Sequence, residues 1–174
     1  MEAQNSQVNI LVIRSATRIL NQTLISLREE FPDCKITVLV PQSVQEAVAQ
    51  DPLVDEVLTI PDQRRMGVSS YGKKNIVRLQ EKKFDIAVSL YNIDHGLGYA
   101  NIDRLAFATK AKEVRGYNPK GTFVKLDSSK VTRKSIQEKT TFFLARNKLC
   151  CHSVYVFNHY FCIDRRMVRS QTAR

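Results

Sequence analysis

The chain has 174 residues, of which 43% are hydrophobic and 25% are charged, and its formal net charge is +10. This length predicts one or two compact domains, and the composition excludes disordered, collagen-like and multi-span membrane chains. The first residues, Met1-Glu2-Ala3-Gln4-Asn5, have neither a basic nor an apolar stretch, so no secretory signal is expected. Four cysteines are too few for a disulfide scaffold, and a cytoplasmic location is therefore expected.

The basic charge is concentrated in the last quarter of the chain. Residues 1–127 contain 17 Lys and Arg against 15 Asp and Glu, whereas residues 128–174 contain 10 against 2. The sequence therefore predicts a nearly neutral domain over residues 1–127 and a basic tail over residues 128–174. Nucleic acid is not an expected partner, because the domain has no basic excess and the tail carries no known nucleic-acid motif.

The first 117 residues alternate between strand-like and helix-like segments. Apolar runs rich in β-branched residues predict strands over residues 8–13, 36–40, 56–60, 84–90 and 114–117. Helical periodicity predicts helices over residues 18–31, 72–83 and 102–112, with Arg28, Glu29 and Glu30 turned to solvent, and a capping box predicts a short helix starting at Ser43.

This order of elements predicts an α/β fold: a doubly wound, mostly parallel, Rossmann-like sheet with the first strand in its centre. The helices are expected on both faces, joined by right-handed crossovers. The expected core positions are Ile10, Val12, Val38, Val40, Ile86 and Val88, because parallel strands are covered on both faces.

Ligands of such sheets bind beyond the carboxyl ends of the strands, where three loops are expected, over residues 14–18, 41–43 and 91–99. The first loop contains no glycine, so a dinucleotide-binding motif is absent, and Gly72-Lys73-Lys74 is not a phosphate-binding Walker loop. No tightly bound cofactor is expected. Arg14, Thr17 and Arg18, with Asn92 on the third loop, are the candidates for binding an anion or an acceptor at the start of the first helix. The alternative is that both arginines are solvated loop residues.

The third loop also carries the candidates for acid/base chemistry. Asp94 and His95 are adjacent; histidine titrates near neutral pH, and a carboxylate can orient its ring. The alternative is that Gly96 and Gly98 make this segment a tight turn with no catalytic part.

The tail contains the candidates for a metal site. Cys150, Cys151, His152, His159 and Cys162 place five zinc-ligand side chains within thirteen residues. Their spacing matches neither the Cys-x(2–4)-Cys knuckle nor the His-x(3–5)-His arm of structural zinc sites, so no metal is expected. Reduced cysteines of this kind more often pack as small hydrophobic residues.

Residues 141–163 are rich in Phe, Leu, Val and Tyr but too polar for a membrane span. Their apolar residues share a helical face, and basic residues flank it. This pattern fits a helix lying on an anionic membrane surface, and the alternative is an amphipathic helix packed on the sheet domain.

Five segments follow one another in a particular order and spacing: Ile10-Leu11-Val12-Ile13-Arg14, residues 27–40, residues 51–57, Phe84-Asp85-Ile86-Ala87-Val88, and residues 105–118. Together they resemble the N-terminal half of the ADP-heptose:lipopolysaccharide heptosyltransferase family, which has the GT-B fold. The resemblance covers about residues 8–118. It implies a glycosyltransferase of lipopolysaccharide biosynthesis, acting at the inner face of the membrane on a lipid-linked or polysaccharide acceptor.

The resemblance also implies what this chain lacks. In the family a second Rossmann-like domain binds the nucleotide-sugar, and residues 128–174 are too few to form one. A Gly-Asp after the first strand supplies the family's base, whereas this chain has Ser15-Ala16-Thr17-Arg18. The chain is therefore expected to be inactive alone, as a truncated or frame-shifted copy would be, and to need a donor-domain partner or a homo-oligomer. The alternative function is a non-enzymatic binding module held by its basic tail to an anionic membrane or nucleic acid.

Overall fold

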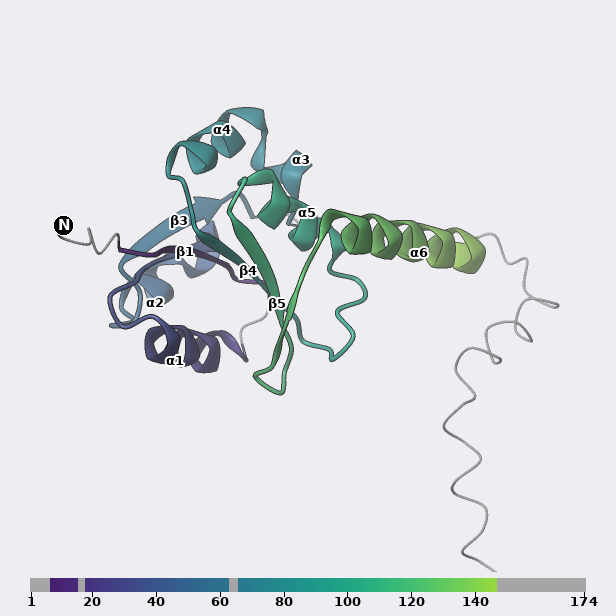
Figure 1. The fold of residues 1–174 in the computed structure, drawn as a ribbon. Coiled ribbons are helices and arrows are strands. Elements are labelled where there is room, and N and C mark those ends of the chain that lie inside the picture. The colour runs from purple at the N-terminus through teal and green to yellow at the C-terminus, as the bar shows by residue number, and fades with distance from the viewer. Residues whose placement is uncertain (1–6, 16–17, 63–65, 147–174) are drawn as a thin grey trace, which may run out of the picture. The chain divides into compact units, whose positions relative to one another are not determined.

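The computed structural model describes residues 7–15, 18–62 and 66–146, and the side chains up to residue 141. Its strands are β1 (Asn9–Ile13), β2 (Lys35–Pro41), β3 (Glu56–Ile60), β4 (Ile86–Leu90), β5 (Glu113–Tyr117) and β6 (Phe123–Lys125). They form one sheet in the order β3-β2-β1-β4-β5-β6 (Figure 1). The first five strands pair in parallel and β6 pairs antiparallel with β5. The predicted fold class, with β1 in the interior of the sheet, is confirmed.

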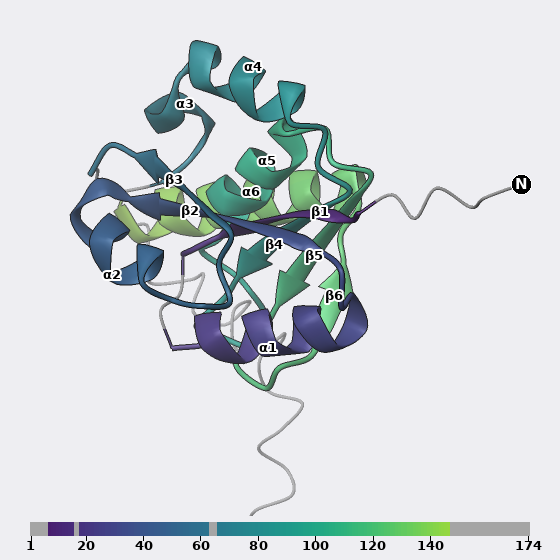
Figure 2. The same cartoon turned by 90° about the vertical axis from the view of Figure 1, so that its left-hand side faces the viewer.

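Helices cover both faces of the sheet (Figure 2). The helices α1 (Leu20–Glu30) and α2 (Gln45–Ala49) pack on one face. The other face carries α3 (Val68–Tyr71), α4 (Lys73–Glu81) and α5 (Ala100–Ala108). Two apolar cores result, one on each side of β1, because successive residues of a strand point to opposite faces.

The core contains every position expected from the sequence. Ile10 lies between Ile36 and Ile86, and Val12 lies between Val38 and Val88, in the parallel register. None of the six predicted core residues is more than 6% exposed. Burial of this kind contributes about 25 cal/mol for each Å² of apolar surface removed from water, so these strands are a main source of stability.

Helix α1 buries its apolar face as predicted. One residue of its predicted polar face is hydrogen-bonded within the protein instead of pointing to solvent. Leu24 and Leu27 are fully buried. The expectation that Arg28 turns to solvent was wrong: its guanidinium donates to the carbonyl of Leu53 at 3.0 Å and to the carboxylate of Asp55 at 2.7 Å. The segment after β2 folds back next to α1 and offers these acceptors, which a charged donor satisfies well.

Two helix boundaries differ from those expected. Ser43 does not cap a helix, because its hydroxyl donates to Asp62 at 2.8 Å, and α2 starts at Gln45 after a 3₁₀ turn (Gln42–Val44). Helix α5 lies two to four residues earlier than expected. It ends where Thr109 donates its hydroxyl to the carbonyl of Ala106 and Lys110 adopts a left-handed φ of 58°.

The chain divides into two compact units, residues 1–135, which contain the sheet, and residues 136–174. Helix α6 (Ser128–Arg146) starts within the first unit. Val131 and Ser135 are buried in the first unit. The division at residue 127 stays a prediction. Of the helix expected over residues 141–163, the part beyond residue 146 lies outside the described residues.

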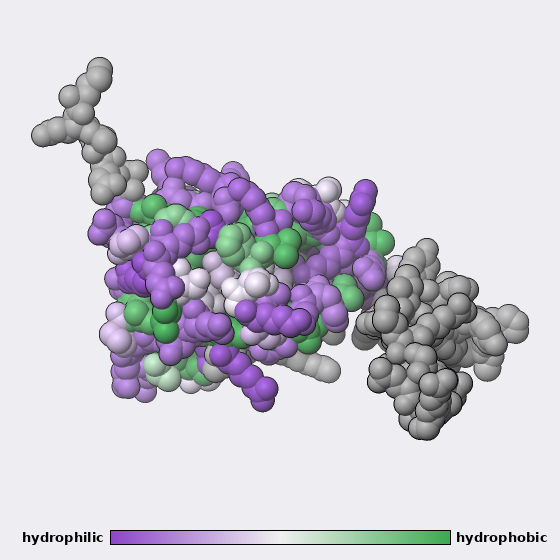
Figure 3. Space-filling view, turned by 60° about the horizontal axis from the view of Figure 1, so that its bottom comes forward, coloured by the Kyte–Doolittle hydropathy of each residue, from purple (hydrophilic) through white to green (hydrophobic). Residues whose placement is uncertain are grey.

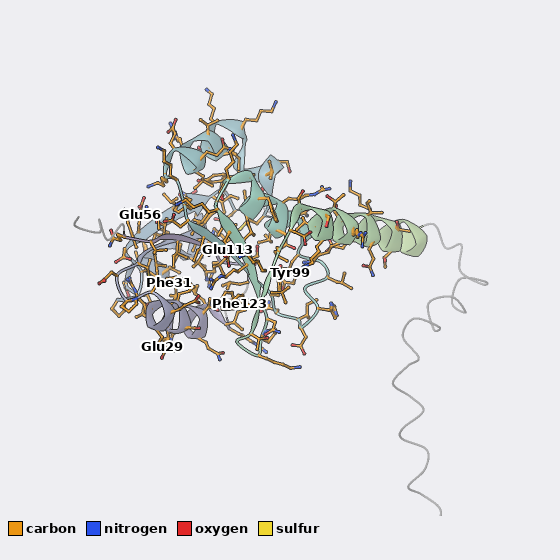
Figure 4. The ribbon with its side chains drawn as sticks, viewed as in Figure 1. Glu29, Phe31, Glu56, Tyr99, Glu113 and Phe123 are labelled. Atoms are coloured by element: carbon orange, nitrogen blue, oxygen red, sulfur yellow. The ribbon has the colours of Figure 1, made fainter. Side chains whose placement is uncertain are left out.

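A buried arginine joins α1 to the end of the sheet. Arg115 of β5 pairs through its guanidinium with Glu30 and with Glu113, each at 2.7 Å. The same guanidinium lies 5.6 Å from the ring of Phe31 and 4.3 Å from the ring of Phe123 (Figure 4). Two carboxylates and two aromatic faces thus neutralise a charge that burial would otherwise disfavour.

Candidate functional site

The candidate site lies where β1 and β4 end side by side. The chain leaves β1 toward β2 and leaves β4 toward β5, on opposite sides, so the strand order reverses between them. Open α/β sheets bind ligands at such a point. The loops that follow β1 and β4 are two of the three loops expected at this edge from the sequence.

A serine bridges these two loops. The hydroxyl of Ser15 donates to the carbonyl of Leu90, the last residue of β4. The backbone N–H of the preceding Arg14 donates to the carbonyl of Leu39 at 3.0 Å, so the start of the loop is tied to both neighbouring strands. The Nε of Arg14 is buried and has no hydrogen-bond partner among the described residues. This side chain therefore retains a donor at the strand ends.

A groove of about 550 Å³ lies next to this point, between α1 and the turn from β5 to β6. Its polar lining includes Arg18, Asn21, Gln22, Glu29 and Lys120. Figure 3 shows that hydrophilic side chains predominate on the drawn face and that apolar ones form small separate groups. The amides and the two cations suit a ligand rich in hydroxyl or acidic oxygen atoms.

Gly121 brings the turn close to the helix. Its φ of 75° lies in the left-handed region, and a Cβ at this position would lie 2.8 Å from the Nε2 of Gln22. A larger residue would strain the backbone at this φ, and the amide end of Gln22 would have to move aside. The shape of the groove thus depends on a residue that sequence reasoning did not single out.

The structure does not bring Asp94 and His95 together. The carboxylate of Asp94 pairs with the ammonium of Lys120 at 2.7 Å, and this hydrogen bond raises the pKa of Lys120. The Nδ1 of His95 accepts the backbone N–H of Leu97 at 3.2 Å. Each side chain is exposed and has a different partner, so the carboxylate does not orient the imidazole. A catalytic part for either residue stays a prediction.

Asn92 lies on the same loop, at its start. Its side chain is exposed, and its backbone N–H donates to the phenol of Tyr99 at 3.2 Å. Tyr99, at the far end of the loop, stacks obliquely on Tyr91 with their ring centres 5.3 Å apart (Figure 4). These contacts close the loop on itself, and a binding role for the exposed Asn92 stays a prediction.

Behind the loop lies a buried polar cluster that sequence reasoning missed. The phenol of Tyr91 donates to Asp103 at 2.6 Å, and the ammonium of Lys134 lies 2.6 Å from the other oxygen of the same carboxylate. The side chain of Asp103 is fully buried. The one signal in the sequence was an acidic residue among the apolar residues of α5. Nothing in the spacing pointed to Lys134, thirty-one residues later.

The remaining candidates are outside the described residues. Thr17 belongs to this group, as do the zinc-ligand candidates Cys150, Cys151, His152, His159 and Cys162. Within the described ranges, no three His, Cys, Asp or Glu side chains are close enough together to hold a metal ion. Among the described helices, none is both long and apolar enough to cross a membrane.

Comparison with known proteins gives matches at the level of structure. No family model matches the chain, and no curated protein matches it. The chain is similar to ADP-heptose LPS heptosyltransferase II of E. coli, with 20% identity, a TM-score of 0.47, and coverage of 63% of this chain and 30% of that one. It is also similar to a family 9 glycosyl transferase from Veillonella parvula DSM 2008, with 21% identity, a TM-score of 0.48, and coverage of 64% and 32%.

This chain therefore spans about a third of the length of each of these structures. The first of them bears the name of the family that the sequence resembles.

Proposed function

We propose that the sheet domain is the acceptor-side domain of a GT-B glycosyltransferase. The observation that carries this proposal is how the resembling segments fall on the fold. Residues 10–14 contain most of β1, residues 36–40 lie in β2, residues 51–57 lead into β3, residues 84–88 lead into β4, and residues 105–118 span the end of α5 and β5. The resemblance thus follows five consecutive strands of one sheet rather than scattered surface segments.

The groove beside α1 supports an acceptor of sugar type. Asn21 and Gln22 offer amides that both donate to and accept from hydroxyl groups, and Arg18 and Lys120 offer charge to a phosphate or carboxylate. A volume of about 550 Å³ has room for a short saccharide. The acceptor would be lipid-linked or a polysaccharide, and the protein would act in the cytoplasm at the inner face of the membrane.

The donor would be a nucleotide-sugar held by a second domain. The described part of the β1 loop presents no carboxylate, so Asp94 and His95 remain the candidates for the base that activates the acceptor hydroxyl. A partner chain with a donor domain would complete the site, or a second copy would contribute to it. Until such a domain is present, the chain should bind its acceptor and transfer nothing.

Titration of the full chain with a lipopolysaccharide core oligosaccharide, followed by calorimetry, tests this proposal. Binding should be saturable, and Arg18→Gln or Lys120→Gln should weaken it about tenfold, as loss of one charged hydrogen bond costs about 1.5 kcal/mol. Lys73→Gln, the same charge change on exposed α4, should leave it unaltered. No binding, or equal binding by all three variants, would contradict the proposal.

Incubation with ADP-, UDP- and GDP-sugars tests the second part. We expect no release of nucleotide with or without the oligosaccharide. Turnover by the chain alone would overturn the need for a donor domain, and Asp94→Ala and His95→Ala would then show which residue serves as base.

A further inference from the structure

A second groove, of about 390 Å³, lies between β3 and α4. Strand β3 is at the opposite end of the sheet from the turn that lines the first groove, and α4 covers the other face. The polar residues that line it are Gln42, Thr59, Tyr71, Asn75, Arg78 and Lys82. The proposed glycosyltransferase site uses none of them.

The side of α4 that faces the groove is largely polar. Asn75, Arg78, Leu79 and Lys82 recur at intervals of three and four, so they follow one side of the helix. The side of α4 that packs on the sheet carries the buried Ile76 and Leu79, and the polar residues lie beside it. Here Leu79 is buried in the core, whereas Asn75 and the two cations border the groove.

The charge beside the groove is not balanced. Glu56, at the start of β3, pairs with Lys82 and also with Lys35, the latter at 3.1 Å (Figure 4). The hydrogen bond from Lys82 is the main cause that lowers the pKa of Glu56, which is therefore ionised at neutral pH. Arg78 forms no ion pair with any residue that the structure describes. Two lysines thus share one carboxylate beside the groove, and Arg78 adds a further cation to its lining.

The groove is also rich in hydrogen-bond donors above an apolar floor. The side-chain amide of Asn75 donates one N–H to the carbonyl of Tyr71 at 2.8 Å, and its second N–H can donate to a ligand. Burial raises the pKa of Tyr71, against the opposing charge of Arg78, so its phenol keeps its proton at neutral pH. Leu58 and Leu79 form the floor.

We propose that the groove between β3 and α4 binds a small organic phosphate monoester, with its phosphate on the guanidinium of Arg78. A guanidinium donates two parallel hydrogen bonds to a phosphate, and the amides of Gln42 and Asn75 and the hydroxyl of Thr59 reach the polar groups of the ester. The volume lies in the range of small-molecule sites. This site is independent of the acceptor groove, and it holds whether or not the chain belongs to a glycosyltransferase.

Titration of the full, isotope-labelled chain with glycerol 3-phosphate, followed by NMR, tests the proposal. The side-chain amide signals of Asn75 and Gln42 should shift and saturate, whereas glycerol should leave them in place. Arg78→Gln should weaken binding at least tenfold, and Arg78→Lys should give an intermediate affinity because it keeps the charge without the planar fork. The matched control is Lys74→Gln, the same charge change on α4 at a residue that does not line the groove, which should bind as the parent does.

Three outcomes would overturn the proposal. Equal weakening by Lys74→Gln and Arg78→Gln would mean that the phosphate is attracted by the overall charge of α4. Equal shifts with glycerol would mean that the phosphate plays no part, and equal affinity for glycerate would mean that the site does not select phosphate. If Arg78→Gln fails to fold, Arg78→Lys against Lys74→Gln decides between the same outcomes.

Discussion

The Nζ of Lys134 lies 2.6 Å from the Oδ2 of Asp103, and the carboxylate of Asp103 has no exposed surface. The same ammonium lies 4.4 Å from the ring of Tyr91, whose phenol donates to the other carboxylate oxygen. A single residue of α6 thus neutralises the most deeply buried acid of the sheet domain and packs on the first residue of the β4 loop. The first turns of α6 are held to α5 by this ion pair.

We therefore predict that Lys134→Met destabilises the chain by about 3–5 kcal/mol, because it leaves a buried carboxylate without its cation. Urea unfolding at neutral pH measures the change. Lys130→Met, which removes an exposed pair with Asp127, should cost less than about 1 kcal/mol. The double variant Lys134→Met with Asp103→Asn should recover part of the loss, and failure to recover any would contradict the ion-pair explanation.

Asp85 makes the free energy of unfolding depend on pH in the acid range. Its carboxylate accepts from Lys112 at 2.7 Å and from the backbone N–H of Asn9 at 2.9 Å, and these bonds hold its pKa below the usual 3.8. A lowered pKa in the folded state contributes stability above pH 3.8 that is lost as the pH falls through the folded pKa.

Asp85→Asn should accordingly reduce the free energy of unfolding at neutral pH by about 1–2 kcal/mol, the value of a charged hydrogen bond. The difference from the parent should shrink as the pH is lowered below 3.8. Chemical unfolding at a series of pH values checks this, and a difference that stays constant down to the lowest pH would rule out the assignment.

Cys34 should resist alkylation in the native chain. Its side chain is 2% exposed, and burial raises the pKa of its thiol, so both access and the thiolate fraction are low. Treatment with iodoacetamide followed by mass spectrometry should find Cys34 unmodified in buffer and modified in urea. Rapid modification in buffer would show that the contact between α1 and the following strand opens readily.

The basic tail predicts binding to anionic membranes. Full-length protein should sediment with vesicles that contain anionic lipid, and the binding should weaken as salt rises. Replacing Arg165, Arg166 and Arg169 by Gln should weaken it about a hundredfold, since each basic residue near the surface adds about 1 kcal/mol.

The matched control for the tail replaces Lys73, Lys74 and Lys83 of the sheet domain by Gln, which changes the charge equally. Lys134 is kept in both variants, because its removal would leave the buried carboxylate of Asp103 without a cation. Equal binding by both variants, or equal binding to neutral vesicles, would show that the tail is not a membrane anchor.

Most of the sheet could be predicted from the sequence because β1, β2, β4 and β5 are buried on both faces. An apolar run such as Ile10-Leu11-Val12-Ile13 predicts a buried strand by itself, before the strands that pair with it are known. The short β6 could not be predicted, since Phe123 and Val124 stay exposed and pair only with β5. A strand of three residues is also too short to show the alternation of apolar and polar residues by which a strand is predicted.

The candidate site was only partly predictable for a different reason. Loops at the carboxyl ends of strands follow from the order of elements, so Arg14 and Asn92 could be placed at the correct edge. Contacts between distant residues carry no local pattern. For that reason Lys120 beside Asp94, and Lys134 beside Asp103, became visible only in the folded chain.

The hydrogen bond from Ser15 to Leu90 has a consequence for how any substrate approaches. It ties the start of the β1 loop to the last residue of β4, at the point where the strand order reverses. A ligand in the groove between α1 and the β5–β6 turn would therefore lie beside this hydrogen bond, and the bond would have to break before a group could enter between Ser15 and Leu90.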